Sequence, residues 1–170
     1  AWGLLLGHAG MAILVAGVTG SSAWTVEKIQ ALNVGDSVEV AGYEFTLTGV
    51  TRGQGPNYQY QRGAFLVTRD GEEFDILTPE KRFFPVERNE TTEAAIRTTF
   101  LGDLYAVIGD QTPDGKWVTR LYFNPLVPWI WAGCLFMVAG GFASLTDRRL
   151  RIGAPQRRQA APPPAPQPAE

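Results

Sequence analysis

Two long stretches without a charged side chain bracket this chain, and they restrict its fold more than any other feature. Residues 1–24 contain no Asp, Glu, Lys or Arg, and neither do residues 126–146. Helical residues rise about 1.5 Å each, so either stretch is long enough to cross the ~30 Å hydrocarbon core of a bilayer. We therefore predict two transmembrane helices, over residues 1–23 and 126–146, framing a separate domain over residues 24–125.

The N-terminal stretch could instead be a signal peptide, because it stands first and ends in small residues, Gly20–Ala23. It lacks a basic n-region and an initiating Met, and its apolar run exceeds the ~7–15 residues usual in signal peptides. We therefore favour a membrane helix. We also expect the chain to be the C-terminal piece of a longer membrane protein.

The charges outside the helices predict the orientation in the membrane. Residues 25–125 carry ten Lys or Arg and fifteen Asp or Glu, a net of −5, whereas residues 147–170 carry five Arg and two acids, a net of +3. Basic residues directly after a membrane span mark the cytoplasmic side. We expect a bacterial inner-membrane protein with a periplasmic middle domain. Its tail, residues 147–170, should be cytoplasmic, basic and then Pro/Ala-rich and disordered.

The composition gives no support for nucleic-acid binding, because no basic face exists and the arginines of the tail follow a membrane span. Membrane lipid is the partner that such arginines fit. The chain has a single cysteine, Cys134, inside the second predicted helix. No intrachain disulfide can form, so the middle domain must derive its stability from its core.

The middle domain shows the two-residue alternation of β-strands. Three turn signals, each between alternating segments, predict hairpins: they are Gly42, Asp70-Gly71 and Asp114-Gly115. We predict a small antiparallel all-β domain, a barrel or a sandwich, with an OB-like barrel as one option. Residues 89–101 stay undecided, because Ile96 and Phe100 favour a short helix while the many Thr favour a strand.

The only histidine, His8, lies inside the first predicted helix. Helical geometry places Gly3, Gly7 and Gly10 about a quarter turn away, where they would allow another helix to approach closely. Ionisable residues inside a membrane usually mark relays, pathways or ligands. Two interpretations stay open: a neutral imidazole bonded across helices, or an axial ligand of haem iron. Met11, one turn away, could also ligate, but we favour a packing role for it.

No pattern of residues predicts a catalytic site, so we assign no catalytic residue. Two other segments carry candidate binding groups. Tyr58 and Tyr60 follow a Pro56-Asn57 turn, and Arg82 lies among aromatics and prolines. The tyrosines could press on a partner or on a planar cofactor, but we favour a structural role for them. Arg82 could hold a carboxylate such as a haem propionate, but we favour a solvated surface charge.

A series of motifs resembles the C-terminal region of the CcmF family, the haem-lyase subunit of cytochrome c maturation system I. The similarity runs in order from residue 1 to about residue 152. The motifs are Leu6-Gly-His-Ala-Gly-Met-Ala12, Val38-Glu-Val-Ala-Gly-Tyr43, Gln54-Gly-Pro-Asn-Tyr58, Pro79-Glu-Lys-Arg-Phe-Phe84, Thr92-Glu-Ala-Ala-Ile96, Asp103-Leu-Tyr105 and Asn124–Trp131.

The resemblance implies a membrane-bound lyase that joins haem to the CxxCH thiols of apocytochrome c. It implies the haem chaperone CcmE and CcmH-type thiol-reductase or apocytochrome-handling subunits as partners. It also implies a haem b held by two transmembrane histidines, of which His8 matches one. The second histidine and the tryptophan-rich haem-handling segment would lie upstream, in the remaining part of the haem lyase, so we expect this chain alone to be inactive. The alternative is a non-catalytic, membrane-anchored docking module for periplasmic partners.

Overall fold

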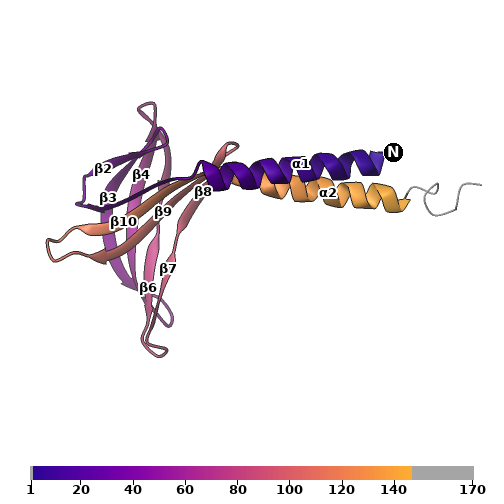
Figure 1. Cartoon of the computed structure of the whole chain (residues 1–170). Helices are drawn as coiled ribbons and strands as arrows, with labels where there is room; N and C mark the ends of the chain where they lie inside the picture. The colour runs from indigo at the N-terminus through magenta and orange to yellow at the C-terminus, as the bar shows by residue number, and fades with distance from the viewer. Residues whose placement is uncertain (1, 147–170) are drawn as a thin grey trace, which may run out of the picture.

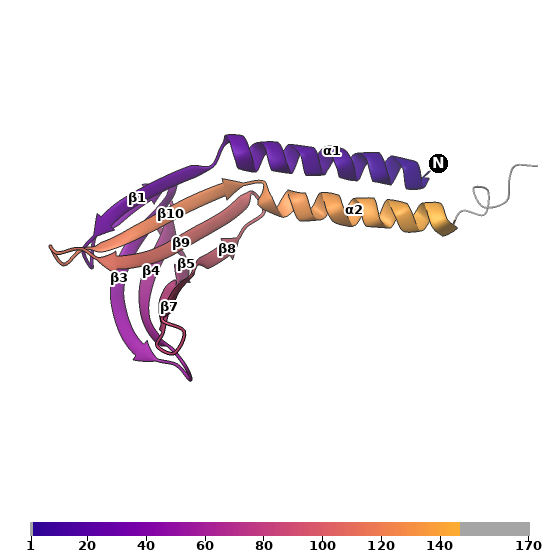
Figure 2. The same cartoon turned by 60° about the horizontal axis from the view of Figure 1, so that its bottom comes forward.

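The computed structural model describes residues 2–146, in which two helices extend from one end of a β-domain (Figure 1). Helix α1 spans Trp2–Ala23 and helix α2 spans Val127–Thr146. They lie side by side and antiparallel (Figure 2), and each is long and apolar enough to cross a membrane. The predicted fold class, two apolar helices framing an antiparallel all-β domain, is confirmed. The predicted tail, residues 147–170, lies outside the described residues.

The β-domain consists of two antiparallel sheets. The four-stranded sheet has the order β1-β10-β9-β8, with β1 at Val26–Leu32, β10 at Trp117–Pro125, β9 at Gly102–Gln111 and β8 at Ala95–Thr98. The six-stranded sheet has the order β2-β3-β4-β6-β7, with β5 also pairing β4. Its strands are β2 at Ser37–Val40, β3 at Tyr43–Gln54, β4 at Gln59–Arg69, β5 at Glu72–Leu77, β6 at Glu80–Phe84 and β7 at Asn89–Glu93.

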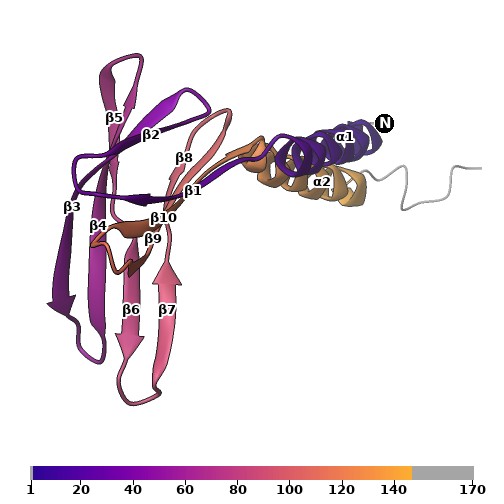
Figure 3. The same ribbon diagram turned by 60° about the vertical axis from the view of Figure 1, so that its left-hand side comes forward.

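The two sheets pack face to face as a sandwich, and within residues 2–146 no strand ladder joins them into a closed barrel. Figure 3 shows the strands of the two sheets crossing steeply, so that one end of β3, β4, β6 and β7 extends beyond the four-stranded sheet. The large side chains that fill the interior are fully buried: Phe45, Leu47, Phe65, Leu104, Ile108 and Leu121. This core forms without a disulfide, and Cys134 is free in α2.

The three predicted hairpins are present. Ala41 and Gly42 have φ of 52° and 79° between β2 and β3, and Asp70 and Gly71 have φ of 54° and 82° between β4 and β5. Two consecutive residues with positive φ form the turn that matches the twist of a two-residue hairpin. Gly115, with φ of 84°, lies in the turn between β9 and β10.

The undecided segment, residues 89–101, contains two short strands, β7 and β8, separated at Ala94. The chain leaves the six-stranded sheet after β7 and joins the four-stranded sheet at β8. The alternation of apolar and polar residues does not predict strands β1 and β6. Six of the seven residues of β1 are exposed, so the strand has no apolar alternation, and β6 is a charged segment that follows a proline.

Glycines line the contact between the helices at intervals of seven residues. Gly3, Gly10 and Gly17 of α1 face α2, and Gly133 and Gly140 of α2 face α1. A Cβ atom on Gly10 would lie 2.7 Å from the carbonyl oxygen of Gly133, so only glycine permits this approach. The sequence predicted that another helix approaches α1 closely at its glycines, and α2 is that helix.

The helices are joined to neighbouring strands of one sheet. β1 follows α1 and β10 precedes α2, and these two strands pair from Val26 opposite Phe123 onward. At the junction, Thr25 Oγ1 donates a hydrogen bond to Asn124 Oδ1 at 3.1 Å. The pair of helices therefore continues directly from a hydrogen-bonded pair of strands.

Candidate functional site

His8 lies on an exposed side of α1, beside the contact with α2. Its Nδ1 is 2.9 Å from the carbonyl oxygen of Leu4, one turn earlier in the helix. A carbonyl oxygen only accepts hydrogen bonds, so Nδ1 is the donor of this bond, and in the neutral imidazole Nε2 then keeps its lone pair. Histidines that ligate metals commonly donate their other ring N–H to such a carbonyl, which fixes the ring and its tautomer.

A groove of about 450 Å³ runs beside His8 between the two helices. It contains no charged side chain, and its lining is formed by Gly3, Leu4, Gly7, His8, Met11, Met137, Gly140, Gly141 and Ser144. A Cβ on Gly7 or Gly141 would meet no atom within 4 Å, so the groove is open above these two glycines. His8 is the strongest ligand for a transition metal among these side chains.

Residues 2–146 contain no group of three His, Cys, Asp or Glu side chains that could hold a metal ion. His8 can therefore contribute one ligand, and any further ligand must come from elsewhere. Within the same residues the one hydrogen bond of the His8 side chain is to Leu4 of its own helix, and none is made to α2.

A second cluster lies on the outer face of the extended sheet, where Glu80 accepts hydrogen bonds from two arginines. Arg62 Nε lies 2.6 Å from Glu80 Oε1, and Arg82 Nε lies 2.8 Å from Glu80 Oε2. Each guanidinium also lies 4.8 Å from the centre of a tyrosine ring, Arg62 over Tyr60 and Arg82 over Tyr58. We call these five residues the arginine–tyrosine cluster.

The arginine–tyrosine cluster is held together by its own charges. Burial of Glu80 acts to raise the pKa of its carboxyl, but the hydrogen bonds from Arg82 and Arg62 outweigh burial and lower this pKa below the ordinary value of 4.5. The hydrogen bond to Glu80 likewise raises the pKa of both guanidinium groups. The guanidinium of Arg82, the group considered for binding a propionate, thus forms ion pairs with Glu80 at 2.8 Å and with Glu93 at 3.4 Å.

The rings of Tyr58 and Tyr60 also pack against other residues of the β-domain. The ring of Tyr60 lies against Gly53, and that of Tyr58 lies against Gly55 and within 5.5 Å of Phe84, centre to centre. A ring that covers a glycine in a neighbouring strand, as Tyr60 of β4 covers Gly53 of β3, fills the space that the missing side chain leaves. The structural interpretation of Tyr58 and Tyr60 therefore fits the contacts that they make.

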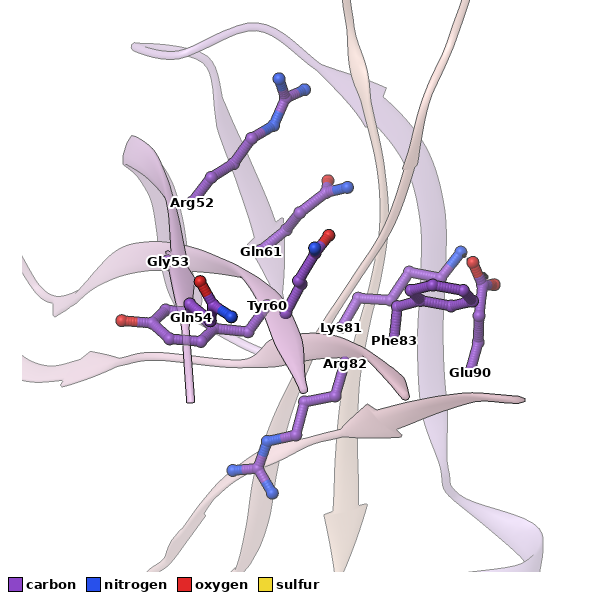
Figure 4. Close-up of a pocket in the computed structure, with 10 residues that line it drawn as sticks. Arg52, Gly53, Gln54, Tyr60, Gln61, Lys81, Arg82, Phe83 and Glu90 are labelled. Carbon is purple, nitrogen blue, oxygen red and sulfur yellow. Dashed lines mark ion pairs between the residues drawn. The ribbon is translucent and has the colours of Figure 1, made fainter. Parts of the chain in front are cut away.

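The opposite face of the same strands forms a cleft of about 420 Å³, which we call the inner-face cleft (Figure 4). Its main lining groups are Arg52, Gln54, Gln59, Gln61, Lys81, Phe83 and Glu90. Figure 4 shows Lys81 beside Glu90 while Arg82 points the other way, since neighbouring residues of β6 alternate between faces.

Lys81 connects the inner-face cleft to the other sheet. Its Nζ lies 2.8 Å from Glu90 and 2.5 Å from Asp110 of β9. Partial burial acts to lower the pKa of Lys81, but the hydrogen bonds to Asp110 and Glu90 outweigh it and raise this pKa above 10.5. The ammonium is therefore a structural cation with two anionic partners rather than a base available for proton transfer.

A family model described as "CcmF C-terminal beta-sandwich" matches residues 23–125. The chain belongs to the CcmF family. The cytochrome c-type biogenesis protein CycK of Bradyrhizobium diazoefficiens is 42% identical over 160 residues, which are 94% of this chain and 24% of CycK. The cytochrome c-type biogenesis protein ccl1 of Rhodobacter capsulatus is 46% identical over 157 residues, 92% of this chain and 24% of that protein.

The cytochrome c-type biogenesis protein CcmF of Escherichia coli is 39% identical over 150 residues, 88% of this chain and 23% of that protein. The solved structure titled "Cytochrome c Heme Lyase CcmF" superposes with a TM-score of 0.67 at 22% identity, covering 85% of this chain and 24% of that one. This chain therefore has the fold of the corresponding CcmF region, and it spans about a quarter of the length of the curated relatives it matches.

The sequence of this CcmF-family chain predicts only some of the residues in the candidate sites. The sequence indicates His8, the two tyrosines and Arg82 as candidate binding residues. It does not indicate the residues of α2 that line the groove, or that Glu80 joins the two arginines. The repeated seven-residue spacing of Gly133 and Gly140, matching Gly3 and Gly10, could have revealed the groove. No signal in the sequence singles out Glu80 among fifteen acids of the domain.

Proposed function

We propose that this chain is the C-terminal part of a cytochrome c haem lyase and that His8 supplies one axial ligand to a haem b in the membrane. Membership of the CcmF family and the names of the relatives, all cytochrome c-type biogenesis proteins, support the first part. The observation that carries the second part is the free Nε2 of His8 at a groove without charged groups.

The described residues fit one side of a haem. A neutral imidazole is a good axial ligand for haem iron, and the Leu4 carbonyl orients the ring and increases the basicity of Nε2. Gly7 and Gly141 leave the groove open where a flat apolar ring must approach. A haem with two imidazole ligands supplies electron transfer, because no position on the iron remains open.

The helices cross the bacterial inner membrane in this proposal, with the β-domain in the periplasm and the tail in the cytoplasm. The acidic charge of residues 25–125 and the arginines after residue 146 support this orientation. The remaining part of the haem lyase supplies the second histidine. The proposed partners are the haem chaperone CcmE, CcmH-type subunits and apocytochrome c, whose CxxCH thiols receive the haem.

The test is the visible spectrum of the full-length protein carrying His8→Ala, with Met11→Leu as the matched control in the same groove. We expect His8→Ala to lose or shift the low-spin b-type spectrum and to lower the haem content, with partial recovery in added imidazole. Met11→Leu should keep both, because in this proposal Met11 lines the groove without binding the iron. An unshifted spectrum with normal haem content in His8→Ala would show that His8 is not the ligand.

A further inference from the structure

We propose that the loop between β8 and β9, residues 99–101, lies in the headgroup region of the bilayer and anchors the β-domain to the membrane surface. We call it the membrane-contact loop. Figures 1 and 2 show the end of β8 beside the start of α2, on the side of the β-domain from which both helices leave. The inference rests on the proposed membrane crossing of α2.

Hydrogen bonds fix the membrane-contact loop to the first turn of α2. The backbone N–H of Leu126 donates to the carbonyl oxygen of Leu101 at 2.8 Å. The indole Nε1 of Trp129 donates to the carbonyl oxygen of Phe100 at 3.0 Å. Trp129 is only two residues into α2, about 3 Å along its axis, so the loop lies at the level where the helix begins.

The side chains of the membrane-contact loop are apolar and open. Phe100 is 74% exposed and Leu101 is 53% exposed, although both stand in a domain with a well-formed core. The Phe100 ring meets the Trp129 ring edge to face, with centres 4.9 Å apart. Residues 98–102 carry no charge, and the next residue, Asp103, is buried.

Lipid is the partner that this arrangement fits. A tryptophan at the start of a membrane helix places its ring among the headgroups, with the N–H turned to a polar acceptor. The N–H of Trp129 has such an acceptor, the carbonyl oxygen of Phe100 in the membrane-contact loop. Phe100 and Leu101 therefore stand at the same depth, where exposed apolar side chains enter the boundary of the acyl chains.

The same side of the domain carries a further exposed ring at the end of α1. Trp24 follows the last residue of α1 and is 64% exposed. The first turns of α2 add Trp131, which is 70% exposed. Aromatic rings thus mark both places where the chain passes between β-domain and helix, as expected for an interfacial belt that the membrane-contact loop extends.

The test uses the full-length protein with Cys134→Ser and any other native cysteines also replaced, reconstituted in vesicles with an environment-sensitive fluorophore on one new cysteine. The test position is Leu101→Cys. The control is Val34→Cys, 55% exposed and thus matched to Leu101, in the connection between β1 and β2. Seven residues of β1 place Val34 about 23 Å from the end of α1. A label at Val138, 55% exposed in mid-α2, reports whether the helix crosses the membrane.

We expect the Leu101 label to emit at shorter wavelength than the Val34 label and to be quenched by lipids that carry a nitroxide near the headgroup. The Val34 label should be quenched by aqueous iodide instead. If iodide quenches the Leu101 label as strongly as the Val34 label, the loop lies in water and the proposal is wrong. If neither quencher reaches the Leu101 label, protein covers the loop, which also overturns it. A Val138 label that deep nitroxide lipids fail to quench would contradict the membrane crossing itself.

Discussion

Glu80 is the residue of the arginine–tyrosine cluster whose loss should lower the stability of the β-domain most, because both arginines bond to it. Its side chain is 9% exposed and accepts hydrogen bonds from Arg62 and Arg82. Glu80→Gln keeps the shape but removes the charge, and its amide group can accept from only one arginine while its own N–H groups face the other. The substitution therefore removes one charge-assisted hydrogen bond and weakens the second.

The size of the effect follows from the exposure of the arginines. A hydrogen bond to a charged group contributes about 1.5–3 kcal/mol, and breaking a buried ion pair costs up to about 5 kcal/mol. The side chains of Arg62 and Arg82 are 45% and 29% exposed, so water recovers part of the loss. We expect Glu80→Gln to lower the free energy of unfolding by about 2 kcal/mol, a fall of roughly 10 °C in Tm for a domain of this size.

The assay is thermal unfolding of the chain in detergent, followed by near-ultraviolet circular dichroism, with Glu73→Gln as the control. Glu73 is an exposed strand glutamate of β5, and its substitution should leave Tm within about 2 °C. Equal Tm values for Glu80→Gln and Glu73→Gln would refute the role assigned to the arginine–tyrosine cluster.

The dependence of this difference on pH provides a second test. The pKa of Glu80 is lower in the folded state than the ordinary 4.5. Its contribution to stability is therefore complete above pH 4.5 and is lost as the pH falls through the lower folded-state pKa. The unmodified chain and Glu80→Gln should converge in Tm at acidic pH, and a constant difference down to the lowest pH measured would contradict the assigned cause.

Two glycine substitutions test the helix contact and a hairpin turn. Gly10→Leu should force α1 and α2 apart, because its Cβ would lie 2.7 Å from the backbone of α2. Gly141→Leu should not, because no atom lies within 4 Å of the Cβ position there. The distance between spin labels on the two helices measures the separation. Gly71→Ala should destabilise the β-domain by about 1 kcal/mol, because Gly71 has a φ of 82°. Gly49→Ala should not, because Gly49 has neither a positive φ nor a close neighbour. Chemical denaturation compares the stability of the two variants.

Features of the fold that depend on local sequence could be predicted, and those that depend on distant partners could not. The Asp70-Gly71 turn was predicted because a hairpin turn needs particular residues at particular positions. Strand β1 was missed because it pairs with β10, which lies some ninety residues away, and because its side chains stay exposed on both faces. Exposure removes the alternation on which the prediction of strands rests.

The candidate sites divide in the same way. His8 was found because an ionisable residue in an apolar helix is conspicuous in the sequence alone. The arginine–tyrosine cluster could not be found from the sequence, because Arg62 and Glu80 come together only through the pairing of β4 with β6. Arg82 looked available for a ligand until that pairing placed Glu80 between the two guanidinium groups.

The way the helices are held determines how a substitution at His8 should be interpreted. Glycine-to-glycine contact fixes α1 against α2 along the membrane, and the pairing of β1 with β10 fixes both helices at their base. Within residues 2–146, His8 takes part in neither contact, since its one hydrogen bond is to Leu4 of its own helix. Removing the imidazole therefore leaves these two contacts of α1 unchanged. A loss of haem in His8→Ala would then report the loss of a ligand rather than a displaced helix.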